Sequence, residues 1–204
     1  ARSIFAESIL RTEAGDRFTA YSAGTRPQSD LNPFALDVLK QKGHDLSDLR
    51  AKYITEFQGS DAPDLDFVFT VCNQAANEEC PPWEGQPITA HWGMPDPVKA
   101  EGALAQRMLA FQQAYGMLRN RILAFTELPF DALDRISLQR AVDDLRVASW
   151  PFNGTALYET MHNAIEDVVE SGSGGVRAIL FVTDGYNNTT WYGRTLEQVR
   201  GRAA

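Results

Sequence analysis

The segment that most limits the possible folds of this chain is LDFVFTVC at residues 65–72. Apolar side chains fill most of its positions, and its length suits a single strand. This pattern is typical of a strand that is buried on both faces, and such strands belong to parallel sheets. Because parallel strands are joined by crossover connections that are usually helices, the rest of the chain must supply helices between its strands.

The flanking sequence shows this alternation of helices and strands. Asn32 suits the cap of a helix, Pro33 suits its first position, and Gly43 suits the residue after its end. Strands that alternate with helices predict an α/β fold with an open parallel sheet and ligands at the carboxyl ends of its strands. The predicted elements are helices over 2–12, 33–42, 101–126 and 134–145, and strands over 17–23 and 65–72.

Residues 73–99 hold five of the ten prolines and predict one long loop, which in a compact domain is usually functional. Cys72 ends the buried strand, and Cys80 lies inside the loop. Two thiols at this spacing fit a redox pair, because the loop can bring one sulfur onto the other. The other interpretation is a buried strand cysteine with an incidental partner.

Charge and hydropathy exclude several classes of partner. The net charge of −8 argues against nucleic acid or an anionic membrane as the main partner. No apolar run reaches the roughly 18 residues of a membrane span, and no secretory signal is visible at the first residues. With only two cysteines, we expect a reducing, cytoplasmic location.

Composition changes after residue 145, since all four lysines lie before it. We therefore expect two units, residues 1–145 and residues 146–204. For the second unit the sequence pattern predicts a helix over 155–170, a glycine-rich turn, a strand over 177–183 and a short last helix. One strand is too little for an independent core. We expect this segment to be a poorly anchored appendage, although its strand could instead complete the sheet of the first unit.

Six motifs of the first unit resemble, in order, the arsenate reductases built on the low-molecular-weight protein tyrosine phosphatase fold. In that family a loop of the form Cys-x-Gly-Asn-Ser-x-Arg-Ser joins the first strand to the first helix. Ala1, Arg2 and Ser3 match only its last three positions, so we expect the nucleophilic cysteine and the first strand to precede residue 1. The motifs are ARSIFAESIL, AYSAGTRP, NPFALDVLKQKG, DFVFTVCNQAANEECPPWEGQP, ITAHWGMPDP and LPFDALDRISLQRAVDDL.

The resemblance implies thiol-dependent reduction of arsenate to arsenite, although the 204-residue chain would be inactive without the nucleophile. Arg2 would bind arsenate or phosphate as a guanidinium fork, Ser3 would orient the loop, and Asp96 would act as the general acid. Cys72 and Cys80 would form the relay that thioredoxin or glutaredoxin reduces, without a further cofactor. A protein tyrosine phosphatase of the same fold is the alternative enzyme. Without the resemblance, Asp96 would be interpreted as a turn residue.

Residues 146–204 resemble the second half of a von Willebrand factor A domain, through FNGTALY at 152–158 and AILFVTDGYN at 178–187. The resemblance implies that Thr155 and Asp184 contribute to a Mg²⁺ site. The family's Asp-x-Ser-x-Ser ligands are missing from this sequence, so that site would be incomplete. A helix cap and a turn explain the two residues equally well. We therefore expect the chain to be a fragment or a fusion. A non-enzymatic binding module is the alternative to an enzyme.

Overall fold

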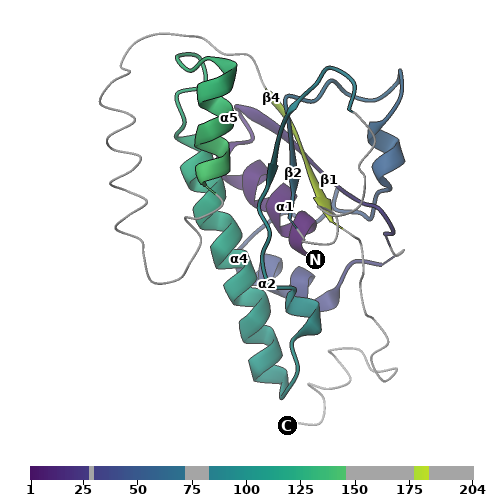
Figure 1. Ribbon diagram of the computed structural model, residues 1–204. Helices are drawn as coiled ribbons and strands as arrows, with labels where there is room; N and C mark the ends of the chain where they lie inside the picture. The colour runs from purple at the N-terminus through teal and green to yellow at the C-terminus, as the bar shows by residue number, and fades with distance from the viewer. Residues whose placement is uncertain (28–29, 72–82, 146–176, 184–204) are drawn as a thin grey trace.

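The computed structural model describes residues 1–27, 30–71, 83–145 and 177–183 (Figure 1). Four strands form one parallel sheet in the order β1-β4-β2-β3. The prediction of an α/β fold with a parallel sheet is therefore confirmed. The elements are α1 (Arg2–Ala14), β1 (Phe18–Gly24), α2 (Pro33–Gln41), the 3-10 helix η1 (Ile54–Phe57), β2 (Phe67–Thr70), β3 (Ile88–His91), the 3-10 helix η2 (Pro97–Lys99), α4 (Leu104–Thr126), α5 (Arg135–Asp144) and β4 (Arg177–Thr183).

The strand latest in the sequence, β4, lies in the interior of the sheet. All seven of its residues pair with β1, from Phe18 opposite Arg177 to Gly24 opposite Thr183. On its other side it pairs with all of β2. The expectation that residues 146–204 form an appendage is therefore wrong for residues 177–183. The other predicted elements of that segment lie outside the described residues.

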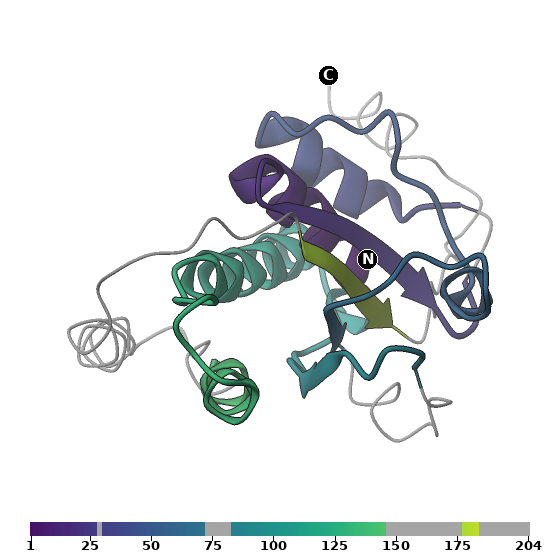
Figure 2. The ribbon, with the colours of Figure 1, turned by 90° about the horizontal axis from the view of Figure 1, so that it is seen from above.

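Burial explains why β4 takes the central place. Ile179 and Phe181 belong to the main hydrophobic core, whereas Leu180 and Val182 belong to a second cluster with η1. All four side chains are fully buried. Figure 2 shows α1 and α4 on one side of the sheet and η1 on the other, so β4 is covered on both faces. A continuous apolar run is what such a strand requires.

Polar contacts fix the register at the start of β4. The Arg177 guanidinium lies 2.6 Å from an Asp131 carboxylate oxygen and 4.9 Å from the Phe130 ring centroid. The Ala178 amide donates to Asp66 Oδ2 at 2.8 Å. Asp66 is the only carboxylate inside the apolar run at 65–72, and this contact accounts for its place there.

The long loop predicted for residues 73–99 contains the strand β3 (Ile88–His91), which the sequence analysis missed. It is short and lies at the edge of the sheet beside β2. Its alternation is brief, with Ile88 and Ala90 buried and Thr89 exposed. Edge strands tolerate polar residues and neighbouring prolines because one side needs no partner, and this masks the usual strand signal.

The local signals around α2 are confirmed. Asn32 Oδ1 accepts hydrogen bonds from the amides of Phe34 at 3.0 Å and Ala35 at 3.4 Å. Pro33 occupies the first turn, and Gly43 has a φ of 81°, a left-handed conformation that favours glycine. These features start and end the helix within a few residues of the predicted positions.

A buried histidine joins three helical segments. His44 Nδ1 lies 2.9 Å from Ser8 Oγ and 3.0 Å from Thr12 Oγ1 of α1, and its Nε2 lies 2.8 Å from the Tyr115 hydroxyl of α4. Burial lowers the pKa of His44 below its ordinary value. These hydrogen bonds hold the turn after α2 against both α1 and α4.

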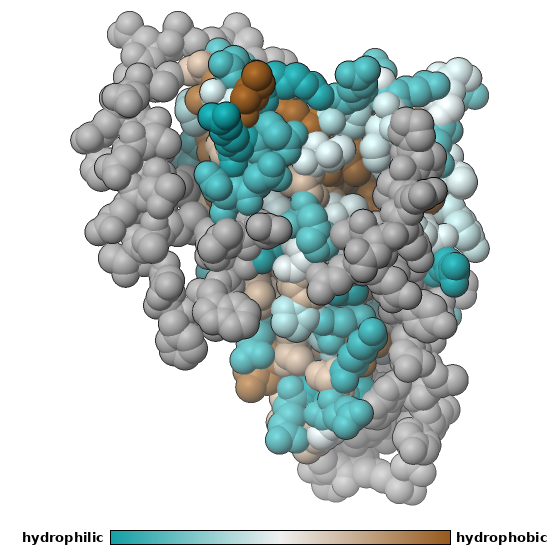
Figure 3. Space-filling model, in the orientation of Figure 1, coloured by the Kyte–Doolittle hydropathy of each residue, from teal (hydrophilic) through white to brown (hydrophobic). Residues whose placement is uncertain are grey.

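Hydrophilic side chains dominate the surface drawn in colour in Figure 3, and the apolar patches on it are small and separate. Among the described residues, Ile136 on α5 and Leu109 on α4 are large apolar side chains that are 68% and 51% exposed. Within the described ranges, no helix combines the length and apolar character needed to cross a lipid bilayer.

The central place of β4 predicts a large cost for truncating it. Phe181→Ala should lower the free energy of unfolding by about 3–5 kcal/mol, because it leaves a cavity where Phe181 packs beside Phe69 and Trp92. Ile136→Ala, at an exposed site, should change it by about 0.5 kcal/mol or less. Urea unfolding followed by circular dichroism measures both values.

Equal stabilities for the two variants would show that β4 does not lie in the core. Limited proteolysis near Arg146 provides a second check. The cleaved pieces should elute together from a sizing column, and separate elution would support the appendage instead.

Candidate functional site

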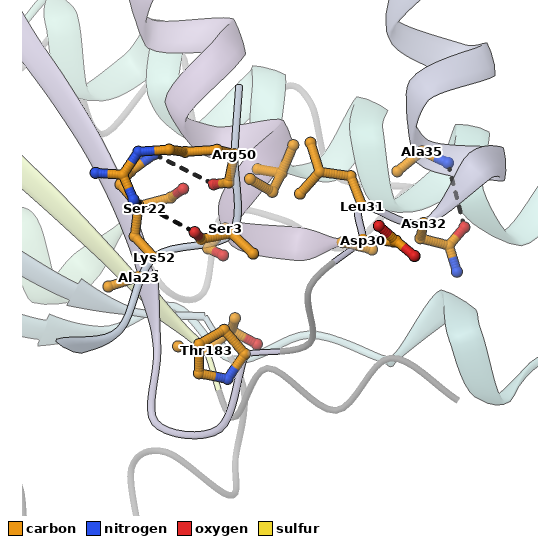
Figure 4. A pocket seen from close by; sticks show the side chains of 15 residues that line it. Ser3, Ser22, Ala23, Asp30, Leu31, Asn32, Ala35, Arg50, Lys52 and Thr183 are labelled. Atoms are coloured by element: carbon orange, nitrogen blue, oxygen red, sulfur yellow. Dashed lines mark hydrogen bonds between the residues drawn. The ribbon is translucent and has the colours of Figure 1, made fainter. Parts of the chain in front are cut away.

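A pocket lies at the carboxyl edge of the sheet, where β1 and β4 end and α1 begins. Its hollow measures about 460 Å³, including space that is open to solvent. In Figure 4, Ser22 and Lys52 lie on one side of Ser3, and Asp30 and Asn32 on the other. The lining residues are Ala1, Ser3, Ile4, Ser22, Ala23, Gly24, Pro27, Asp30, Leu31, Asn32, Ala35, Arg50, Ala51, Lys52 and Thr183.

The start of α1 forms part of this pocket. Ser3 and Ile4, in the first turn, line it, and that turn contains no acidic residue. The first amides of any α-helix point away from its body without partners in the helix, and they carry partial positive charge. This end of the pocket therefore suits an anion.

The structure brings the predicted residues Arg2 and Asp96 together, although 94 positions separate them. Arg2 Nη2 lies 3.3 Å from Asp96 Oδ2, and Arg2 Nη1 donates to the Met94 carbonyl at 3.0 Å. The two side chains are only 6% and 10% exposed. Asp96 Oδ1 accepts a hydrogen bond from the Val98 amide at 3.1 Å, so Asp96 also caps η2. A buried guanidinium beside a nearly buried carboxylate thus flanks the start of α1, although neither side chain is among those that line the pocket.

A buried charge cluster that the sequence analysis missed lies beside the pocket. Glu7 of α1 is 1% exposed, and its two carboxylate oxygens lie 3.1 and 3.0 Å from Lys52 Nζ. Ser22 donates to the same carboxylate at 2.5 Å, and Arg11 donates to it at 2.8 Å. The ion pair with Glu7 holds the Lys52 ammonium at the wall of the pocket.

One signal for this cluster was present in the sequence. Glu7 lies within the apolar run IFAESIL, and α1 has few solvent-facing positions near it. An acidic residue in such a helix must find a buried partner, because an unpaired buried charge is too costly. Lys52 carries no comparable local signal, because 45 positions separate it from Glu7.

His91 and Trp92, which precede the segment with Asp96, make packing and hydrogen-bond contacts. Trp92 is fully buried and stacks on Phe69 with ring centroids 4.1 Å apart. His91 Nδ1 lies 2.8 Å from the Thr70 hydroxyl at the ends of β2 and β3. Neither residue lines the pocket at the start of α1.

Four predicted site residues fall outside the described residues: Cys72, Cys80, Thr155 and Asp184. Their roles in a thiol relay and in a Mg²⁺ site therefore stay predictions. Within the part of the chain that the structure describes, no three His, Cys, Asp or Glu side chains gather so that they could hold a metal ion.

Comparison with known proteins agrees with this geometry. Residues 1–135 match the family described as low molecular weight phosphotyrosine protein phosphatase. The chain belongs to that family. The matched phosphatase-family residues include α1, with Arg2 and Ser3, and the loop that carries Asp96, but they end before β4.

Several relatives of this phosphatase-family chain are arsenate reductases. The arsenate reductase of Shouchella clausii is 35% identical over 126 residues, which cover 62% of this chain and 87% of the relative. That of Bacillus licheniformis is 33% identical over 130 residues, with the same coverage. That of Bacillus subtilis is 32% identical over 126 residues, again covering 62% and 87%.

The buried ion pair between Glu7 and Lys52 should contribute much more to the free energy of unfolding than an exposed ion pair does. Glu7→Gln should lower the free energy of unfolding by about 3–5 kcal/mol, because it leaves the Lys52 ammonium buried without its counter-ion. Glu56→Gln, which breaks the exposed Arg50–Glu56 pair, should cost about 1 kcal/mol or less. Chemical unfolding of both variants measures the difference.

The double variant Glu7→Gln, Lys52→Met should recover part of the loss, since it removes the stranded charge. No recovery would mean that Glu7 stabilises the fold through Ser22 and Arg11 rather than through Lys52.

Proposed function

We propose that the start of α1, beside the Arg2–Asp96 pair, binds a tetrahedral oxyanion, arsenate or phosphate, for the thiol-dependent reduction of arsenate to arsenite. The observation that carries this proposal is the contact between Arg2 and Asp96 beside the first turn of α1. A guanidinium fork and helix amides suit the oxyanion charge, and a carboxyl group can protonate its leaving oxygen. The arsenate reductases among the relatives support the choice of arsenate.

The reaction has three thiol steps. A thiolate in the loop that precedes Arg2 in the family pattern attacks arsenic, and one arsenate oxygen leaves as water after Asp96 supplies a proton. Cys72 then attacks the first sulfur, the sulfur–arsenic bond breaks, and arsenite leaves with the electron pair. Cys80 attacks Cys72, which frees the first thiol and leaves a Cys72–Cys80 disulfide. Thioredoxin or glutaredoxin, a dithiol reductant, returns that disulfide to two thiols.

We propose that Arg2 and Asp96 act on the oxyanion together with the thiolate that the family pattern places ahead of Arg2, because the first covalent step needs that thiolate.

Phosphotyrosine hydrolysis is the second candidate, favoured by the family description that residues 1–135 match. The same oxyanion pocket and general acid serve both reactions. Cys72 and Cys80 favour reduction, because hydrolysis of a phosphomonoester needs no resolving thiols. In both cases Arg2 and Asp96 keep their roles.

Oxyanion binding gives the direct test. Titration calorimetry should detect saturable binding of arsenate and of phosphate, and Arg2→Lys should weaken both by about tenfold or more, because an ammonium cannot make the two-pronged contact. Arg119→Lys is the matched control: Arg119 on α4 is 43% exposed and pairs with Glu13, so affinity should not change.

Absence of saturable binding, or equal affinities for the Arg2 and Arg119 variants, would contradict the proposal. Thiol-dependent arsenite release that Cys72→Ser abolishes would support arsenate reduction. Release of phosphate from phosphotyrosine would favour the phosphatase.

The thiol relay makes a separate chemical prediction. Mild oxidation should link the peptides that contain Cys72 and Cys80 with the loss of two hydrogen atoms, because a relay needs the sulfurs to meet within bonding geometry. Mass spectrometry of a digest detects the linked peptides. The Cys80→Ser variant should give no such product, and two freely alkylated thiols after oxidation of the unmodified chain would count against the relay.

A further inference from the structure

Two arginines from two different helices hold the segment that carries Asp96. We call residues 92–96, Trp-Gly-Met-Pro-Asp, the acid segment. Arg121 of α4 donates from Nη1 to the Trp92 carbonyl at 2.6 Å and from Nη2 to the Gly93 carbonyl at 3.4 Å. Arg2 of α1 contacts the next carbonyl, that of Met94, and the Asp96 carboxylate. Three successive carbonyls and one carboxylate therefore face the two guanidinium groups.

Arg121 occupies a place where packing alone favours an apolar residue. It is 2% exposed and shares the buried side of α4 with Leu118, Ile122 and Phe125. Burial lowers its pKa to about 10, so its guanidinium still carries a charge at neutral pH. A buried charge is costly unless it makes strong hydrogen bonds, and well-packed apolar residues often replace one without loss of stability. Its contacts with the acid segment therefore point to a role beyond packing.

The acid segment is also fixed at both of its ends. Trp92 stacks on Phe69, and its indole donates to the Val142 carbonyl at 3.3 Å. Asp96 caps η2 through the Val98 amide. Between these ends lies Gly93, whose backbone can rotate more freely than that of any other residue type. The hydrogen bonds from Arg121 act on the carbonyl of this glycine and on the carbonyl before it.

We propose that Arg121 is a positioning residue, which fixes the path of the backbone through Gly93 and so places the Asp96 carboxylate against Arg2. Arg121 donates to the backbone carbonyls of Trp92 and Gly93, and its proposed role therefore runs through the acid segment rather than through the oxyanion itself. The part of this inference that concerns catalysis depends on the proposed function, because it assigns Asp96 to an oxyanion bound at Arg2.

The variant Arg121→Lys tests whether the charge of Arg121 or the geometry of its guanidinium matters. Its ammonium keeps the positive charge but cannot donate to two carbonyls in a fixed fork. With Arg121→Lys, the Asp96 carboxylate should no longer be held beside Arg2 and the bound anion. Asp96 then competes less with the anion for the Arg2 guanidinium, so arsenate should bind about threefold to tenfold more tightly. Arg119→Lys, two positions earlier on α4, is the control and should leave the affinity unchanged.

A double-mutant cycle distinguishes positioning from general loosening of the fold. Asp96→Asn should itself tighten arsenate binding, and Arg121→Lys should add nothing in that background, because the group that it positions has lost its charge. An equal effect of Arg121→Lys with and without Asp96→Asn, or no effect in either, would overturn the proposal. Calorimetry at fixed pH and ionic strength measures all four affinities.

A ligand-free measurement keeps this inference separate from the proposed function. In the unliganded protein, Arg121→Lys should shift the NMR resonance of the Val98 amide and speed its hydrogen exchange about tenfold, since that amide reports the contact with Asp96. The Ala90 amide in β3 should not change. Failure of arsenate to bind would contradict the proposed function alone, whereas an unchanged Val98 amide would overturn the role of Arg121.

Discussion

The pairing of β4 with two neighbouring strands is the interaction on which the rest of this structure depends. Without it, β1 and β2 would each present an open edge of unpaired amides and carbonyls, and the two hydrophobic clusters would lose a shared wall. The same strand brings Thr183 to the pocket at the start of α1. Residues 1–135 match the phosphatase family, yet the sheet that supports its site includes residues beyond that match.

Buried charges organise the site around the first turn of α1. Arg2 reaches toward the acid segment, whereas Glu7 reaches in another direction toward Lys52 and Ser22. Each of these groups has lost much of its hydration, so each depends on its partner for stabilisation. A charged ligand that enters the pocket meets side chains whose orientation is already fixed. Groups held in this way need little reorganisation to meet a charged ligand, which is the usual advantage of a preorganised polar site.

The sequence predicted local features well because their causes are local. The cap at Asn32 and the turn at Gly43 involve neighbours in the chain, and α2 begins and ends close to where they indicate. The meeting of Arg2 and Asp96 followed from a family resemblance, since no periodicity links positions so far apart. The place of β4 could not be read from its residues, because an apolar run fits any interior slot of a parallel sheet. The partners of Glu7 and Arg121 depend on that same long-range assembly, although the position of each charge among apolar neighbours was a visible signal.

The order of the strands in space differs from their order of synthesis. The strand at the centre of the sheet is the last of the four to be made, after both of the strands that flank it. Contacts between residues that are distant in sequence form slowly, because the entropy of closing a long loop is lost before the contacts compensate for it. During synthesis, β1 and β2 therefore either stay unpaired until β4 is made or pair with each other first and separate when β4 inserts between them. Thr183, at the end of β4, joins the lining of the pocket only at that final step, so the pocket takes its shape late in folding.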